Sequence, residues 1–185
     1  MKVLGMGFPK TGTNSLKEAL GVFGLKVEHY PGEYHRRMML HGDFSWPEDY
    51  EGLVNTGENY YRTLHRIYGD EMRFILTTRE TESWAESLRK WWLRGGDKTS
   101  KWCHLDELRR LDRVRVFGTG IFNYDHMVSI YEQHNDSARA YFADKPNFIE
   151  LPVELTDDEK WLRLSGLFGM ETPLMPYPVK NRARL

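Results

Sequence analysis

The chain has 185 residues, enough for one domain with its own hydrophobic core. A net charge of −1 provides no basic field for nucleic acid, and the single cysteine, Cys103, excludes an internal disulfide and fits a reducing compartment. No apolar stretch approaches the roughly 20 residues of a membrane span, and the N-terminus lacks a signal-peptide pattern. We therefore expect one cytoplasmic domain over residues 1–185, with neither nucleic acid nor a membrane as its partner.

Apolar runs alternate with amphipathic segments along the chain, which predicts an α/β fold with a mostly parallel central sheet flanked by helices. The run "MRFILTT" is the most apolar and β-branched, so we expect it at the centre of the sheet. We expect strands at 2–7, 24–30, 50–56, 72–78 and 147–152. We expect helices at 14–23, 33–41, 58–69, 81–93, 104–117, 123–143 and 156–168, with a loop at 94–103 and an extended basic tail at 172–185.

The stretch "GFPKTGTNSL", residues 7–16, joins the first predicted strand to the first predicted helix. Gly7 and Gly12 have the spacing of the nucleotide-binding loop G-x-x-x-x-G-K-[ST], but Thr13 and Asn14 stand where that pattern has its lysine and hydroxyl residue. The lysine of this loop is Lys10, three residues earlier. Main-chain N–H groups at the start of the helix can still bind an anion, so the loop predicts an anion site without the usual lysine.

Side chains around this loop support an anion site and argue against a metal site. The hydroxyls of Thr11, Thr13 and Ser15 add hydrogen-bond donors, and Thr13 or Asn14 is the expected N-cap of the helix. The central strand ends in Thr-Thr-Arg rather than in an acidic residue that would hold Mg²⁺. We therefore expect no metal. An alternative is a glycine-rich turn that binds nothing.

Three motifs together resemble sulfotransferases that use 3′-phosphoadenylyl sulfate, in particular the small sulfotransferase-like branch. "PKTGTNSL" is similar to their 5′-phosphosulfate loop, Pro-Lys-[Ser/Thr]-Gly-Thr-Thr/Ser. "FILTTRETESWAES" places Arg79 eight residues before Ser87, as in the family's 3′-phosphate site. "WLRLSGLFGMETPLMPYPVKN" resembles the family's closing helix and tail. The order of the motifs matches, and the resemblance covers most of the chain.

This resemblance implies a P-loop NTPase-like fold and transfer of a sulfuryl group from 3′-phosphoadenylyl sulfate to a hydroxyl or amine of a small-molecule acceptor. The other product is adenosine 3′,5′-bisphosphate. The sequence departs from the family at Asn14 and Asn55, and its tail lacks the Arg-Lys-Gly triplet of cytosolic members. The implied cofactor-binding residues are Pro9, Lys10, Thr11, Gly12, Thr13, Asn14, Ser15, Arg79, Ser87, Lys180 and Arg182.

The residues suit this chemistry, because a sulfuryl group carries less negative charge than a phosphoryl group and needs less compensation. Lys10 would meet charge on the leaving phosphate. An acceptor needs a general base, and we favour His29 at the end of the second strand, followed by Glu58 after the third. A single histidine is more often structural or on the surface.

Other interpretations stay open at the level of sequence. A small-molecule kinase with a degenerate loop is one, although its lysine and metal-binding acid are missing; a non-catalytic nucleotide- or anion-binding module is another. Arg79 could form a surface salt bridge and Ser87 could be solvated. Four tryptophans could belong to the core or line an acceptor site, and helical spacing favours the core: Trp84, Trp91, Trp92 and Trp102.

Overall fold

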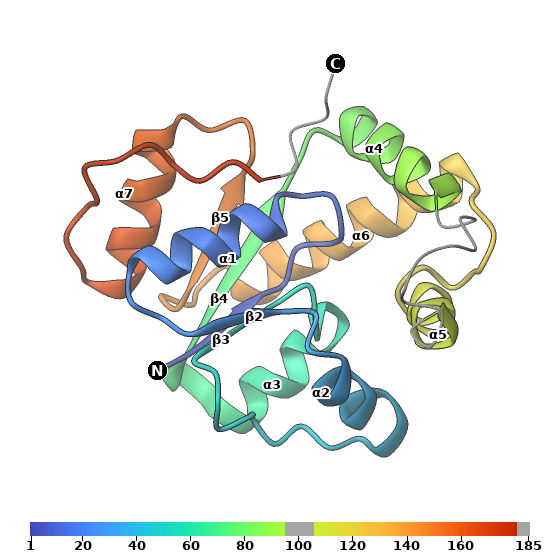
Figure 1. The fold of residues 1–185 in the computed structure, drawn as a ribbon, viewed down its shortest axis with the longest axis horizontal. Helices are drawn as coiled ribbons and strands as arrows, with labels where there is room; N and C mark the ends of the chain where they lie inside the picture. The colour runs from blue at the N-terminus through green and yellow to red at the C-terminus, as the bar shows by residue number, and fades with distance from the viewer. Residues whose placement is uncertain (95–105, 181–185) are drawn as a thin grey trace.

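Five parallel strands form one central sheet in the order β2-β3-β1-β4-β5 (Figure 1). The structure is a computed structural model that describes residues 1–94 and 106–180. The strands are β1 (Lys2–Gly5), β2 (Val27–His29), β3 (Gly52–Val54), β4 (Met72–Thr78) and β5 (Phe148–Pro152). The expected α/β class and parallel sheet are confirmed; residues 72–78 form an interior strand between β1 and β5, whereas the middle strand is β1.

Helices fill the connections between the strands. The α-helices are α1 (Thr13–Val22), α2 (Gly32–Arg36), α3 (Tyr61–Tyr68), α4 (Thr81–Arg94), α5 (Asp106–Phe117), α6 (Tyr124–Phe142) and α7 (Asp157–Phe168). Three short turns supplement them: a π-helical turn, η1 (Arg37–His41), and the 3₁₀ turns η2 (Glu58–Tyr60) and η3 (Gly69–Glu71). None of the helices within the described residues combines the length and apolar character needed to cross a bilayer.

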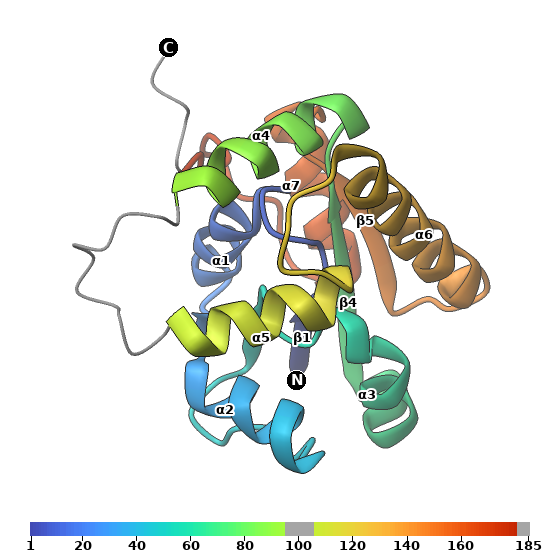
Figure 2. The same cartoon turned by 90° about the vertical axis from the view of Figure 1, so that its right-hand side faces the viewer.

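Alternation of side chains along β1 divides the core into two layers. Val3 faces α1 and α7, whose residues form one buried cluster with it, while Leu4 faces α2, α3 and α6 in a second cluster. A third cluster, centred on Phe8 and Trp84, lies between α4, α5 and α6. Figure 2, turned by 90°, shows α1 and α6 on opposite sides of the strands.

The order of the strands creates a topological switch point at their carboxyl ends. β1 and β3 are neighbours, yet β1 continues into α1 on one face of the sheet and β3 leads to α3 on the other. Ligands of parallel α/β sheets bind where adjacent connections diverge in this way. This switch point lies at the end of β1, close to the start of the loop of residues 7–12.

Several predicted boundaries differ from the structure. The strands at 24–30 and 50–56 are only three residues long, and the helix expected at 33–41 continues from α2 into the π-helical turn η1. The helix expected at 58–69 begins with the 3₁₀ turn η2. The loop expected at 94–103 is wrong at its first residue, since α4 includes Arg94, and its other residues, with Trp102, lie outside the described residues.

Candidate functional site

The loop after β1 has two residues in the left-handed backbone region. Lys10 has φ 78° and Gly12 has φ 88°. A glycine adopts this conformation freely, whereas a lysine does so at a cost that the surrounding structure must offset. The residues around Lys10 must therefore hold its backbone in this conformation.

Two threonines hold the loop against the end of β4. The Thr11 hydroxyl donates to the Phe8 carbonyl at 2.6 Å, and its Oγ1 lies 2.7 Å from Oγ1 of Thr77. Gly7 lies so close to Thr77 that a β-carbon there would overlap both the hydroxyl and the carbonyl oxygen of Thr77. The loop thus needs glycine at position 7 for close approach and threonine at position 11 for anchoring.

The start of α1 differs from the start of α7 in a way that suits an anion. α7 begins with a capping box formed by Thr156 and Glu159, and its first turn is acidic. Among the described residues no side chain caps α1, whose N-cap is Gly12 and whose first turn lacks acidic residues. The first N–H groups of a helix have no partner within the helix. The start of α1 therefore presents N–H groups that can bind an anion.

This geometry corrects one expectation about the helix start. Neither Thr13 nor Asn14 is the N-cap, because the helix already includes both and Gly12 provides the cap position in left-handed conformation. The Thr13 side chain is instead directed to β2, where its Oγ1 lies 3.1 Å from Nε2 of His29.

His29 lies beside the loop, as the position at the end of β2 led us to expect. Burial, and then the positive charge of Lys17, lower the pKa of the His29 imidazole below its ordinary value of 6.5. The imidazole is therefore neutral at pH 7, and a neutral imidazole can accept a proton.

Glu58, the second candidate base, is much less accessible. Its side chain is 2% exposed and borders a small cavity, which it shares with His35, also buried, and Arg115 of α5. The Arg115 guanidinium donates to the Met39 carbonyl at 3.0 Å and so ties α5 to η1 beside this cavity. The geometry favours His29 over Glu58 for a role at the loop.

Arg79 lies between β4 and α4, Ser87 lies within α4, and Ser83, which the sequence motifs do not mark, stands between them. Arg79 follows β4 directly, and its Nε donates to Oγ of Ser83 at 2.9 Å. Ser83 and Ser87 are four residues apart in α4, so they share one helix face. The four-residue steps from Arg79 to Ser83 to Ser87 are the signal that could have identified Ser83.

The tail returns to the start of α1. The main-chain N–H of Lys180 donates to Oγ of Ser15 at 3.0 Å, and the Lys180 ammonium lies 3.8 Å from a carboxylate oxygen of Glu18. The tail is held in place by Trp161, whose indole donates to the Met175 carbonyl at 2.7 Å, and by the buried Tyr177. Arg182, the other predicted tail residue, lies outside the described residues.

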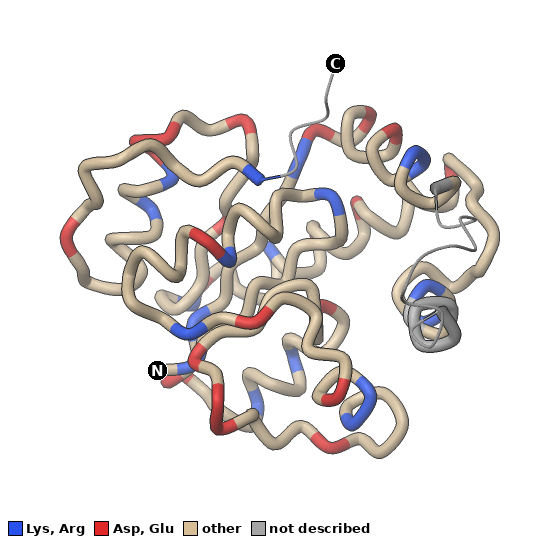
Figure 3. The backbone as a smooth tube through the Cα atoms, in the orientation of Figure 1, with Lys and Arg blue, Asp and Glu red and all other residues tan. Residues whose placement is uncertain are grey.

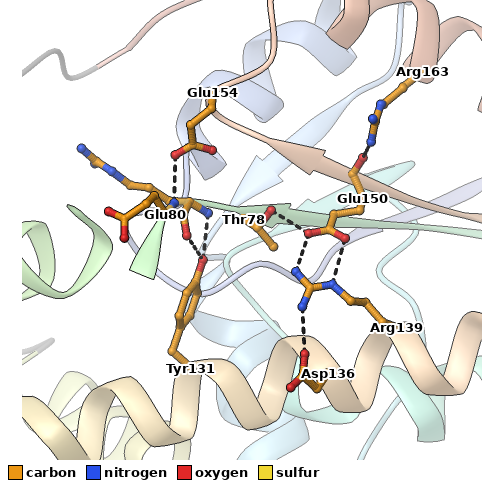
Figure 4. Close-up of polar contacts among 9 residues, drawn as sticks. Thr78, Glu80, Tyr131, Asp136, Arg139, Glu150, Glu154 and Arg163 are labelled. Carbon is orange, nitrogen blue, oxygen red and sulfur yellow. Dashed lines mark hydrogen bonds and ion pairs between the residues drawn. The ribbon is translucent and has the colours of Figure 1, made fainter. Parts of the chain in front are cut away.

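A polar groove of about 560 Å³ lies next to Arg79, between the end of β4 and α6. Figure 4 shows the contacts along it: Arg139 makes a two-pronged ion pair with Glu150, which also accepts from the Thr78 hydroxyl at 2.9 Å. The Arg139 guanidinium holds the pKa of Glu150 below its usual range. Arg79 itself lines this groove, whereas no residue of the loop does.

Aromatic residues from α4 and α6 connect the two halves of the candidate site. Trp84 is fully buried, as its helical spacing predicted, and its indole N–H donates to the Pro9 carbonyl at 2.9 Å. On α6, the Tyr131 hydroxyl contacts the Arg79 main chain, and His134 Nε2 lies 2.9 Å from the Met6 carbonyl. Neither α6 residue could be recognised from the sequence, since nothing in their local pattern relates them to residues so distant in the chain.

Charge is mixed over the molecule. Figure 3 shows Lys and Arg interspersed with Asp and Glu along the described backbone. Any attraction for an anionic ligand therefore has to come from local groups at the loop, such as Lys10 and the helix N-terminus.

Comparison with protein families gives one match that spans almost the whole chain. A family model described as a sulfotransferase domain matches residues 2–184. Comparison with curated proteins finds no match.

Proposed function

The chain belongs to the sulfotransferase-domain family, and on that basis we propose that it transfers a sulfuryl group from 3′-phosphoadenylyl sulfate to a hydroxyl or amine of a small-molecule acceptor. The observation that carries the proposal is the loop before α1, where Lys10 and the uncapped helix N-terminus lie in one strand-to-helix turn. We also propose that residues 1–185 act as one domain in the cytoplasm.

In this proposal the nucleotide supplies the activated sulfuryl group, and the chain binds it at two ends. The loop, Pro9 to Ser15, receives the 5′-phosphosulfate through main-chain N–H groups and hydroxyls. Arg79 and the serines of α4 receive the 3′-phosphate, since a guanidinium matches the oxygen geometry of a phosphate.

Two side chains carry the chemistry. Lys10 provides positive charge where negative charge develops on the leaving phosphate, so its effect is largest in the transition state. His29, neutral and in contact with Thr13, accepts the proton of the acceptor group. The acceptor approaches the switch point at the carboxyl ends of the strands.

The test is a comparison of two nucleotides in the presence and absence of metal. Adenosine 3′,5′-bisphosphate with EDTA should stabilise the protein by roughly 2 to 4 kcal/mol at 100 to 1,000 times its dissociation constant. The melting temperature in a thermal-shift assay should rise accordingly. A shift with ATP and Mg²⁺ but none with the bisphosphate would instead favour a kinase.

A further inference from the structure

We infer that Trp84 and Tyr131 are positioning residues that set the place of Arg79 relative to the phosphate loop. The inference rests on the proposed function, in which the loop and Arg79 hold opposite ends of one nucleotide. A ligand with two phosphates at a fixed separation is bound well only when its two sites keep that separation.

The first contact is with the loop. Trp84, in the first turns of α4, donates its indole N–H to the Pro9 carbonyl at 2.9 Å, directly before Lys10. The indole is fully buried among Phe8 and other aromatic side chains. A buried N–H that lost this acceptor would leave an unsatisfied polar group, so the indole fixes the loop at Pro9.

The second contact is with Arg79. The Tyr131 hydroxyl accepts from the Arg79 main-chain N–H at 2.8 Å and donates to the Arg79 carbonyl at 2.8 Å. One hydroxyl therefore satisfies both main-chain groups of the residue that follows β4. Figure 4 shows Tyr131 reaching from α6 toward the chain between Thr78 and Glu80.

The third contact joins the first two. The rings of Trp84 and Tyr131 are stacked, with centroids 4.0 Å apart and an angle of 11° between their planes. Each ring is thus fixed at one end by the backbone of the site and along its face by the other ring. A further link between the loop and β4 exists through Thr11 and Thr77, so removal of the aromatic link should loosen the site without dismantling it.

The experiment compares Tyr131→Phe with a matched control on the same helix. Tyr131→Phe keeps the stacked ring and removes the hydroxyl that holds Arg79. Tyr141→Phe removes a hydroxyl that contacts Nδ1 of His65 at 2.9 Å, away from the loop and Arg79. Calorimetry measures the binding of adenosine 3′,5′-bisphosphate and of adenosine 5′-monophosphate, which lacks the 3′-phosphate.

We expect the parent protein to prefer the bisphosphate. Tyr131→Phe should weaken bisphosphate binding about tenfold, the effect of one or two lost hydrogen bonds, with monophosphate binding almost unchanged. Tyr141→Phe should leave both dissociation constants unchanged. In an Arg79→Ala background, Tyr131→Phe should cost no further bisphosphate affinity, because it acts through Arg79.

A second variant tests the loop end of the pair. Trp84→Phe keeps an aromatic ring but removes the indole N–H, so it should weaken both nucleotides, since both carry the 5′-phosphate. It also keeps the inference testable if Tyr131→Phe does not fold.

Two results would overturn the inference. If Tyr131→Phe binds both nucleotides with the parental ratio and only melts at a lower temperature, Tyr131 merely anchors α6. If the parent binds the bisphosphate without preferring it to the monophosphate, the 3′-phosphate role of Arg79 fails and the inference fails with it. The failure of the proposed function as a whole is distinguishable, because the parent would then bind neither nucleotide.

Discussion

Lys10 has the least expected backbone conformation among the residues of the loop. Its φ of 78° lies in the region that favours glycine, and strain of this kind costs about 1 to 3 kcal/mol where the structure enforces it. The neighbouring contacts of Thr11 with Phe8 and Thr77, and of Trp84 with Pro9, hold the loop on both sides of Lys10. Such strain is typical of functional positions, which agrees with a direct role for this lysine.

Replacement of Lys10 by alanine tests that role. Because its charge is needed mostly in the transition state, Lys10→Ala should lower kcat by about 10²-fold or more. Affinity for adenosine 3′,5′-bisphosphate should fall much less, since the loop amides and Arg79 remain. Lys10→Arg should restore only part of the rate, because a planar guanidinium is not a compact point charge.

The measurement uses labelled 3′-phosphoadenylyl sulfate with a simple phenol as the acceptor, together with calorimetry for the bisphosphate. If Lys10→Ala transfers the label as fast as the parent, or loses nucleotide affinity as completely as rate, the lysine does not serve the leaving group.

Assignment of the general base to His29 or to Glu58 gives opposite predictions for the rates of two variants. His29→Gln should lower kcat by about 10²-fold or more, whereas Glu58→Gln should leave most of the rate. The pKa of His29 is lowered, so the parental rate should fall only at pH values below 6.5, as the imidazole becomes protonated. The pH profile of kcat/KM checks this. A profile that keeps its acid limb in His29→Gln and loses it in Glu58→Gln would assign the base to Glu58.

At the scale of elements, the turn from β1 into α1 depends on close contact between the loop and the end of β4. Gly7 has no space for a side chain because Thr77 occupies it, while Gly21, inside α1, has no atom within 4 Å of the position of an added β-carbon. Position 7 therefore excludes a side chain, whereas position 21 has room for one.

This difference gives a matched pair of variants. Gly7→Ala should destabilise the protein by roughly 1 to 3 kcal/mol, since the β4 backbone has to move, and should also weaken bisphosphate binding. Gly21→Ala should stabilise the protein by up to about 1 kcal/mol, because alanine favours a helix, and should not affect binding. Urea denaturation and calorimetry measure both effects. Equal stability of the two variants would contradict the close approach at Gly7.

The elements were largely predictable from sequence, and the errors have physical causes. The apolar run of β4 and the glycine spacing of the loop are local patterns, so both were placed correctly. The N-cap of α1 was predicted incorrectly. The Thr13 side chain contacts His29 of β2 instead of capping α1. The paired segments of β2 and β3 are shorter than their apolar runs, since pairing depends on neighbouring strands rather than on composition.

At the scale of the whole molecule, the candidate site is completed by contacts that join distant parts of the chain. Tyr131 and Arg79 are 52 positions apart, and His134 and Met6 are 128 positions apart. No motif marks Tyr131 or His134. Both lie on the buried face of α6, whose sequence pattern is that of an ordinary amphipathic helix. Motifs therefore identified the residues proposed to touch the nucleotide, and the fold was needed to find the residues that hold them.

His134 provides a test of this long-range support. Its Nε2 lies 2.9 Å from the Met6 carbonyl, and its ring stacks on Phe8 at a centroid distance of 4.2 Å, so it contacts the chain on both sides of Gly7. Burial lowers the pKa of His134 from 6.5 to about 4, outweighing the hydrogen bond to Met6, which acts in the opposite direction. The unfolded chain therefore binds this proton more tightly than the native protein does.

Stability should consequently fall as the pH drops below 6.5 and level off, for this group, below about 4. Between pH 7 and pH 5, His134 alone should cost about 2 kcal/mol of the free energy of unfolding. In His134→Gln this contribution should disappear, so the variant should lose about 2 kcal/mol less than the parent over the same interval, whatever its stability at pH 7. Urea denaturation at both pH values measures the difference. Carboxylates titrate equally in the parent and the variant, so they do not contribute to this difference. If the stability of both proteins depends on pH in the same way, the native protein accepts a proton on His134 as readily as the unfolded chain does. Burial would then not keep this imidazole neutral.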